Sequence, residues 1–333
     1  MLLVTGGAGF IGSNFILRWF SERQEGIVNL DALTYAGSLQ NLRDLPSDAD
    51  CRFVHGSICS HTLLNELFKR FRPRAVIHFA AESHVDRSIA GPDVFVTTNV
   101  LGTTALLDAA RDYWMKLPAS EQESFRFINI STDEVYGSMT PDSAPALETT
   151  PFDPSSPYSA SKAAADQFGR AYLRTYGLPV ITMRCTNNYG PRQYPEKLTP
   201  NMILRALHGK PLPLYGSGRQ IRDWIHTEDF CAAIRLALDK GAPGEIYNVG
   251  AGNEVANEDY VRRLCRILDQ VHPRPDGRPY EAQIAHVADR PGHDIRYALN
   301  AGKIRRELGW RPSICFDDGL FQTVCWYVKQ AGF

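Results

Sequence analysis

Short apolar runs alternate with helical periods along the first half of the chain. Apolar stretches at 1–6, 26–31, 51–56 and 74–80 have the length of buried strands. A helix is expected from about Gly12 to Arg23, and an amphipathic helix from Leu63 to Phe71. A helix over 99–114 and a strand over 125–131 continue the alternation. This rhythm predicts an α/β fold with a doubly wound, parallel, Rossmann-like sheet covered by helices on both faces.

The next predicted helix has clear signals at both ends. Ser156 can cap its start and Pro157 suits its first turn, whereas Gly177 and Pro179 stop it. These signals place a helix over 157–176, and a further strand is expected over 178–186.

The regular alternation weakens from about residue 190. Only short helices, a strand and turn at 211–218, a strand at 245–250 and a late helix over 257–270 are expected there. We therefore expect a first domain over 1–186. Residues 187–333 should form mainly a second, smaller, partly interleaved α/β lobe, with some segments returning to the first domain.

Composition and charge exclude several classes of protein. The 333 residues are 44% hydrophobic and 22% charged, with a formal net charge of −1, which gives no reason to expect a nucleic acid or a membrane surface as partner. The first residues lack the basic segment of a signal peptide. The seven scattered cysteines predict reduced thiols in a cytoplasmic protein. His84, His226 and His293 lack metal-ligand spacing, so no metal site is expected.

A glycine loop directly follows the first predicted strand. The segment TGGAGFIG places Gly6, Gly9 and Gly12 where a helix opens, so the backbone can approach a pyrophosphate. A plain tight turn would also explain glycines alone. Asp31, however, ends the second strand about 20 residues further on, where a carboxylate accepts the ribose hydroxyls of NAD. The same charge should repel the extra phosphate of NADP, so NAD is the expected cofactor and residues 1–186 are expected to form the NAD-binding domain.

Two acids stand side by side after a probable buried strand. In ISTDEVYGS, Asp133 and Glu134 follow Thr132 directly. Such acids are usually solvated loop residues, but a site that needs an acid and a base would use both. Adjacent strand residues point to opposite faces. Both acids can therefore reach one ligand only if the chain leaves extended geometry after Thr132.

Tyr158 and Lys162 lie four residues apart on the helix predicted over 157–176. They project from one face, so the ammonium could stabilise the phenolate, lower the pKa of Tyr158 and make it a usable base. An ordinary surface pair is the alternative for this spacing taken alone.

Together, the glycine loop, Thr132 at a strand end and the Tyr158/Lys162 pair resemble the extended short-chain dehydrogenase/reductase family, whose members oxidise and reduce sugar-nucleotide carbons with bound NAD. Longer segments narrow the resemblance to the nucleotide-sugar 4,6-dehydratases of that family, and they cover nearly the whole chain. They include LDALTYAGSLQNL, HFAAESHVDRSIAGP, FRFINISTDEVYG, SSPYSASKAAAD, NNYGPRQYPEKLTP, GRQIRDWIHTEDF and ADRPGHDIRYALNAGKIRRELGW.

The resemblance implies a lyase that converts dTDP-glucose to dTDP-4-keto-6-deoxyglucose, for deoxysugar biosynthesis. Tyr158 would take the proton of the 4-hydroxyl, supported by Lys162 and Thr132. Asp133 would protonate the departing 6-hydroxyl, and Glu134 would remove the C5 proton. A homodimer packed through helices near 99–114 and 157–176 is also implied.

The resemblance also implies two sets of binding residues, with the lobe over 187–333 binding mainly the substrate. The NAD set is Gly6, Gly9, Phe10, Ile11, Gly12, Asp31, Ala32, Leu33, Thr34, Ser57, Ile58, Phe79, Ala80, Ala81, Glu82, Ser83, Thr98, Tyr158, Lys162 and Asn188. The substrate set is Ser83, Thr132, Asn187, Lys197, Leu198, Pro213, Leu214, Tyr215, Arg222, Asn257, Asp289, Arg290, Pro291, Gly292 and His293.

Some positions depart from the family pattern or allow another interpretation. Ser57 stands where the family usually has an aspartate near the adenine, and Arg192 where an aromatic residue or histidine is more usual. Arg222 could bind a diphosphate bidentately, or form a surface salt bridge to Asp223 or Glu228.

Three other functions remain open from the sequence. One is a 4,6-dehydratase for a UDP- or CDP-sugar, and another is a sugar-nucleotide 4-epimerase. The third is a non-catalytic, NAD-sensing binding protein of the same fold. The acid pair argues against the epimerase, and intact Thr132, Tyr158 and Lys162 argue against the binding protein.

Overall fold

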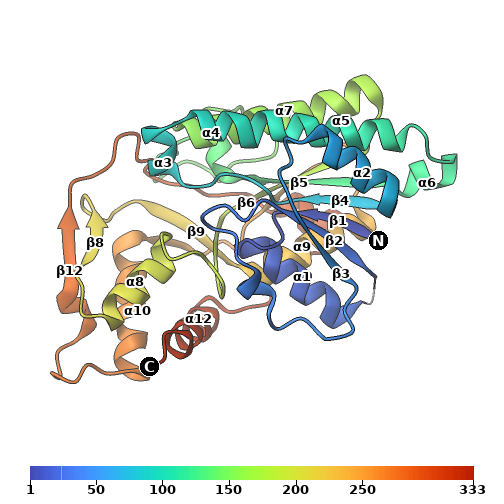
Figure 1. Cartoon of the computed structure of the whole chain (residues 1–333). Coiled ribbons are helices and arrows are strands. Elements are labelled where there is room, and N and C mark those ends of the chain that lie inside the picture. The colour runs from blue at the N-terminus through green and yellow to red at the C-terminus, as the bar shows by residue number, and fades with distance from the viewer. Residues whose placement is uncertain (24) are drawn as a thin grey trace.

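A parallel sheet of seven strands forms the centre of the computed structural model, which describes residues 1–23 and 25–333 (Figure 1). The strand order is β10-β6-β5-β4-β1-β2-β3, so the doubly wound order expected from the sequence is confirmed. The order in which successive strands are added reverses between β1 and β4, and open sheets of this kind bind ligands at that point. The strands are β1 (Leu2–Thr5), β2 (Ile27–Asp31), β3 (Cys51–His55), β4 (Ala75–His78), β5 (Arg126–Thr132), β6 (Val180–Cys185) and β10 (Ile246–Val249).

Helices cover both faces of this sheet, because its strands are apolar on both sides (Figure 1). On one face lie α1 (Phe10–Glu22) and α9 (Thr227–Lys240), and on the other lie α2 (His61–Phe71), α5 (Thr103–Trp114) and α7 (Pro157–Tyr176). Each face buries its own apolar cluster, built around Ile16 and Phe230 on the first and around Leu64, Leu106 and Leu107 on the second.

The ends of α7 form as the sequence predicts. The Ser156 hydroxyl accepts from the backbone N–H of Ser159, whose own hydroxyl receives the N–H of Ser156, so the two residues form a capping box. Pro157 occupies the first turn, and Gly177 ends the helix in the left-handed conformation with φ of 79°.

The helix expected over 99–114 forms differently. A short α4 (Asp93–Phe95) runs into a π-helical segment, η2 (Val96–Gly102), before α5 begins at Thr103. The wider turn places Asn99 in a buried position, only 1% exposed. The expectation of an α-helix from residue 99 is therefore wrong. The π-helical winding also matters for the candidate site, because it buries Asn99.

A second lobe is built from the later part of the chain around its own apolar core (Figure 1). Its helices are α8 (Leu198–Leu207), α10 (Asn257–Val271) and α12 (Phe316–Gln330). The strands β11 (Glu254–Ala256), β9 (Ile221–His226) and β7 (Asn187–Tyr189) form one sheet, and β12 (Ile284–Val287) pairs in parallel with β8 (Leu212–Tyr215). β10 lies next to β6, so the chain passes from this lobe back into the main sheet.

Short elements connect these layers. They are η1 (Leu39–Leu42), α3 (Val85–Ala90), α6 (Ala119–Ser124), η3 (Asp133–Tyr136), η4 (Tyr280–Gln283) and α11 (Gly302–Glu307). Within residues 1–23 and 25–333, no helix combines the length and the apolar character that crossing a membrane requires.

Candidate active site

The glycine loop lies at the switch point between β1 and β4. Gly6 has φ of 72°, and a Cβ on it would lie 2.6 Å from the backbone N of Ala80 in the loop after β4. A Cβ on Gly12 would lie 2.3 Å from the carbonyl oxygen of Gly6. Helix α1 has no side-chain cap and no acid in its first turn. Its N–H groups are therefore available to an anionic group such as a pyrophosphate.

Asp31 is held at the end of β2 by the neighbouring backbone. Its Oδ2 accepts from the N–H of Ala8 at 2.8 Å, and its Oδ1 accepts from the N–H of Leu33 at 2.8 Å. Each carboxylate oxygen keeps a lone pair for another donor, so the residue fits the diol of a ribose.

The loop after β4, Phe79–Ser83, is fixed by Asn99 in the π-helical segment. The Asn99 Oδ1 accepts from the N–H of Glu82 at 2.8 Å, and its Nδ2 donates to the carbonyl oxygen of Glu82 at 2.9 Å. The same amide nitrogen donates to the hydroxyl of Ser161 in α7 at 2.8 Å. Sequence reasoning missed Asn99, because its burial cannot be read from the sequence; its position next to Thr98 in a helical stretch was the available signal.

The remaining residues of the predicted NAD set lie at the start of α1, in the loops after β2, β3 and β4, in η2 and in β7. Phe10 and Ile11 open α1, while Ala32, Leu33 and Thr34 follow Asp31. Ile58 is buried against Gly102, and Thr98 lies in η2. Asn188 lies in β7, and its amide nitrogen donates to the carbonyl oxygen of Thr186 at 3.0 Å.

The acid pair begins η3, immediately after β5. The chain thus leaves extended geometry after Thr132, as a shared site for both acids requires. The Thr132 hydroxyl accepts from the N–H of Glu134 at 3.2 Å and donates to Asp133 Oδ1 at 3.2 Å. Asp133 Oδ2 is buried and has no hydrogen-bond partner among the described residues.

The two carboxyl groups lie in different electrostatic environments. Burial, and secondly the charge of Glu134, raise the pKa of Asp133 well above its ordinary value. Burial also raises the pKa of Glu134, but the nearby cations Arg222, Lys197 and Arg290 oppose the rise. At neutral pH, Asp133 is therefore suited to hold a proton, and Glu134 is the better candidate for the ionised form.

The environment of Tyr158 corrects one expectation. Burial and the charge of Glu134 raise the pKa of Tyr158 well above its ordinary value, although hydrogen bonding by Thr132 lowers it. Burial lowers the pKa of Lys162, whose Nζ donates to the carbonyl oxygen of Ile130 at 2.7 Å. The pKa of Tyr158 is therefore raised overall, so the expected net lowering of this pKa is wrong. The sequence shows the spacing of the pair but not how deeply both groups are buried.

Arg222 approaches the acids from β9. It is 5% exposed, and it donates to the backbone oxygens of Ile221 at 2.8 Å and Asp294 at 3.0 Å. Asp223 instead accepts from the N–H of Asn253 at 2.7 Å. Arg222 is buried, and among the described residues no ion pair joins it to Asp223 or Glu228, so the alternative of a surface salt bridge is wrong.

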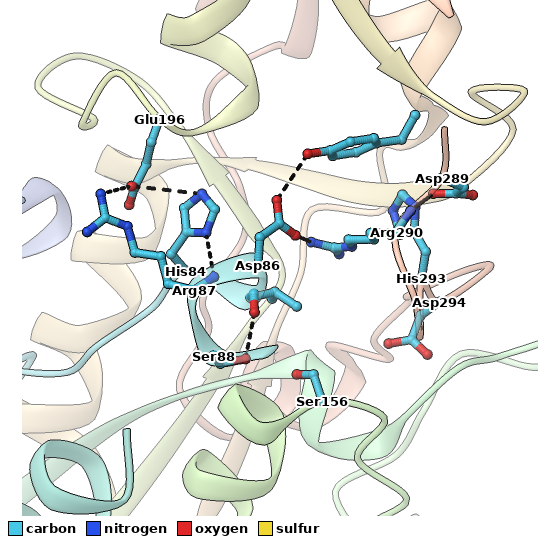
Figure 2. A network of polar contacts seen from close by, with 12 residues as sticks. His84, Asp86, Arg87, Ser88, Ser156, Glu196, Asp289, Arg290, His293 and Asp294 are labelled. Atoms are coloured by element: carbon cyan, nitrogen blue, oxygen red, sulfur yellow. Dashed lines mark hydrogen bonds and ion pairs between the residues drawn. The ribbon is translucent and has the colours of Figure 1, made fainter. Parts of the chain in front are cut away.

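The other residues of the predicted substrate set gather on the second-lobe side. Lys197, at the start of α8, donates to the carbonyl oxygen of Ser83 in the loop after β4. Asp289, Arg290 and His293 lie in the segment after β12 (Figure 2). Asn187 begins β7, Leu198 begins α8, Pro213, Leu214 and Tyr215 lie in β8, Asn257 begins α10, and Pro291 and Gly292 form the turn before His293. The side chain of Leu214 packs in the core of the second lobe, so only its backbone can face a ligand.

Comparisons with known proteins identify the family of the chain. Residues 3–323 match the family described as GDP-mannose 4,6 dehydratase. A dTDP-glucose 4,6-dehydratase of Xanthomonas campestris pv. campestris (strain B100) is 55% identical, over 98% of this chain and 93% of its own. The crystal structure of DesIV, a dTDP-glucose 4,6-dehydratase from Streptomyces venezuelae with NAD and TYD bound, is 47% identical. Its TM-score is 0.89, with 99% of this chain and 98% of that chain covered.

The chain belongs to the family of dTDP-glucose 4,6-dehydratases. A more distant neighbour, the UDP-glucose 4-epimerase of Thermus thermophilus in complex with NAD, is 30% identical, with a TM-score of 0.85 and 98% of each chain covered. Dehydratases and epimerases thus share this fold, and the side chains of the site must separate them.

The two departures from the family pattern have structural roles in this chain. The Ser57 hydroxyl accepts from the N–H of Cys59 at 3.1 Å and so supports the turn after β3. Arg192 has φ of 71° and pairs with Asp44 at 2.6 Å. Neither contact involves the acid pair or Tyr158.

Proposed function

We propose that the protein converts dTDP-glucose to dTDP-4-keto-6-deoxyglucose. The observation that carries the proposal is the buried acid pair, in which one carboxyl group has a strongly raised pKa and the other lies near three cations. Oxidation at C4 makes the adjacent C5–H acidic, and loss of water from C5 and C6 then needs a base at C5 and an acid at C6. A 4-epimerase moves hydride at C4 alone and needs no acid at C6.

NAD fits the glycine loop and Asp31, and when bound it would accept the C4 hydride and later return it to C6. Tyr158 takes the proton of the 4-hydroxyl, with Thr132 as its hydrogen-bonding neighbour. The phenolate is costly in this buried site, so the positive charge of an oxidised nicotinamide would favour it. The Lys162 ammonium, which donates a hydrogen bond to the carbonyl oxygen of Ile130, supports Tyr158 and Thr132 in this role.

Elimination follows from the different states of the two acids. Glu134 takes the C5 proton, and Asp133 gives its proton to the departing C6 hydroxyl, which leaves as water. The free Oδ2 of Asp133 suits this donation, because Oδ1 already accepts from Thr132. Return of the hydride to C6 and of a proton to C5 completes the product.

The choice of nucleotide and the reaction itself are tested by product analysis. The wild-type protein is given dTDP-, UDP-, CDP- and GDP-glucose, and the products are identified by mass spectrometry. We expect loss of one water from dTDP-glucose, with the other nucleotides converted more slowly. Preferred conversion of UDP- or CDP-glucose would show that the protein is a 4,6-dehydratase for that nucleotide sugar. A product of unchanged mass would indicate an epimerase.

NAD is expected to bind much better than NADP, because Asp31 accepts the ribose hydroxyls and its charge repels a 2′-phosphate. Titration of the cofactor-free protein with each dinucleotide measures the difference. Asp31→Asn should reduce the preference by weakening NAD and relieving the repulsion of NADP. Equal affinity of the wild-type protein for both would remove this role for Asp31.

Arg222→Ala should weaken substrate binding about tenfold or more, because a charged hydrogen bond to a diphosphate contributes roughly 1.5–3 kcal/mol. Asn187, at the start of β7, is assigned to the same diphosphate. Calorimetric titration with dTDP gives the affinity, and Arg263→Ala, which removes an exposed arginine paired with Asp317, is the matched control. Unchanged affinity in Arg222→Ala would assign Arg222 a structural role only.

We also infer a homodimer and a cytoplasmic location. Exposed apolar side chains, among them Val96, Leu101 and Phe168, lie on η2 and α7, the region the family resemblance assigns to the dimer contact. All seven cysteines are free in the structure, which supports a reducing compartment.

A further inference from the structure

Asp86, in the first turn of α3, joins the nucleotide-binding side of the molecule to the second lobe. Its Oδ1 accepts from Arg290 Nη1 at 3.0 Å, and its Oδ2 accepts from the hydroxyl of Tyr215 at 3.1 Å. Figure 2 shows Asp86 and Arg290 facing one another from different parts of the fold. One carboxylate therefore holds two residues of the predicted substrate set.

The two donors converge because they come from neighbouring parallel strands. Tyr215 is the last residue of β8, and its partner in the pairing is Val287, the last residue of β12. Arg290 follows three residues later. The carboxyl ends of parallel strands lie at the same edge, so both side chains leave the sheet at the edge where Asp86 lies.

Contacts within the second lobe hold the segment that carries Arg290. Asp289 accepts from Gln220 Nε2 at 2.8 Å and shares a hydrogen bond with His293 Nδ1 at 2.6 Å. The N–H of Gly216 donates to the carbonyl oxygen of Val287 at 3.0 Å. The backbone of this segment is thus placed by the second lobe, whereas the Arg290 guanidinium is placed by Asp86.

Arg290 also lies near enough to Glu134 for its charge to act there. Its charge is among those that oppose the rise in the pKa of Glu134. Its Nε is buried and has no hydrogen-bond partner among the described residues. The guanidinium therefore keeps a donor and a positive charge for an anionic ligand beside Glu134.

The backbone around Asp86 is also held by contacts with the nucleotide-binding side of the molecule. Arg87, its neighbour, pairs with Glu196 at 3.0 Å, and its guanidinium carbon lies 3.8 Å from the ring centre of Tyr35, in the loop after Asp31. Figure 2 shows Arg87 and His84 both directed toward Glu196. The first turn of α3 thus has fixed contacts on the side opposite Arg290.

We propose that Asp86 is a positioning residue that orients Arg290 and Tyr215 for the nucleoside diphosphate of the substrate. This inference rests on the function proposed above and adds a residue outside the predicted site. Asp86 itself does not touch the reacting atoms. It sets the direction of the guanidinium and of the phenol from the first turn of α3.

A purely structural role of Asp86 would show as a lower melting temperature of its variants. The ion pair is partly open to solvent, since the side chains of Arg290 and Asp86 are 20% and 36% exposed. Such pairs contribute little to stability. Loss of Asp86 should then scarcely change the melting temperature, and a change in substrate affinity would reflect the orientation of its two partners.

The test uses the full-length protein with NAD bound and the variants Asp86→Asn, Asp86→Ala, Arg290→Ala and the double variant Asp86→Ala/Arg290→Ala. Asp86→Asn keeps the shape and removes the charge. Asp317→Asn makes the same chemical change in an exposed ion pair of the second lobe and is the matched control. Measurements are the affinity for dTDP, kcat and KM for dTDP-glucose, NAD content and melting temperature.

We expect Asp86→Asn and Asp86→Ala to raise KM and weaken dTDP binding about fivefold to twentyfold, with kcat changed less than threefold. NAD content, melting temperature and the Asp317→Asn control should match the wild-type protein. The double variant should bind dTDP better than the product of the two single effects predicts, because Asp86 acts partly through Arg290; any loss beyond that of Arg290→Ala measures the part that acts through Tyr215.

Wild-type affinity and KM in Asp86→Ala would overturn the inference, as would effects that simply multiply in the double variant. Loss of folding in Asp86→Ala would be distinguished by Asp86→Asn, which must still show the change in KM. These outcomes leave the proposed function intact when the wild-type protein dehydrates dTDP-glucose. If the wild-type protein neither binds dTDP nor converts dTDP-glucose, the proposed function fails and the inference fails with it.

Discussion

Glu134→Gln is expected to stop the reaction after the first oxidation, with bound NADH accumulating in a single turnover. Glutamine keeps the shape of the side chain in η3 but cannot take the C5 proton. Loss of a general base typically lowers the rate about 10²–10⁴-fold. Mixing the NAD-loaded variant with one equivalent of dTDP-glucose and following the absorbance of NADH measures the accumulation.

The control for this variant is Glu123→Gln, an exposed position on α6 away from the acid pair. It should turn over like the wild-type protein without accumulating NADH. If Glu134→Gln lost activity without forming NADH, the residue would act before or during oxidation, and its assignment as the C5 base would be wrong.

Tyr158→Phe should lose turnover by a similar factor but form no NADH at all. The substitution removes the only group assigned to take the proton of the 4-hydroxyl, so the oxidation cannot begin. Binding of dTDP should be nearly unchanged, because the phenol is assigned to the sugar and not to the nucleotide. The same single-turnover absorbance experiment, together with calorimetric titration of dTDP, separates this block from that of Glu134→Gln.

Tyr176→Phe is the matched control, since it makes the same change at an exposed tyrosine at the end of α7. Rapid formation of NADH by Tyr158→Phe would mean that another group starts the oxidation. Thr132, which is close enough to affect the pKa of Tyr158, would then be the first residue to examine.

Local signals in the sequence predicted much of the fold. Helix α7 begins and ends where Ser156, Pro157 and Gly177 indicate, because capping and left-handed backbone depend on residues next to each other. The π-helical segment before α5 was not predicted. Its winding depends on burial of Asn99 against Glu82 and Ser161, and these contacts join parts of the chain far apart in sequence.

The parts of the candidate site whose residues are neighbours in the sequence could be predicted. The opposed environments of Asp133 and Glu134 follow from two neighbouring acids that enter one buried site. The direction of the pKa shift at Tyr158 depends on how deeply the phenol is buried and on its distance from Glu134, which no spacing rule contains. Asp86 and Arg290 are 204 residues apart, and only the meeting of two parallel strand ends with α3 brings them together.

We propose that oxidation at C4 and elimination across C5 and C6 belong to one cycle with the hydride held in the site. This proposal is tested most directly with dTDP-glucose that carries deuterium at C4, turned over in ordinary water and analysed by nuclear magnetic resonance and mass spectrometry. We expect deuterium at C6 of the 4-keto-6-deoxy product, delivered within the same active site. Deuterium retained at C4, or lost to the solvent, would contradict it.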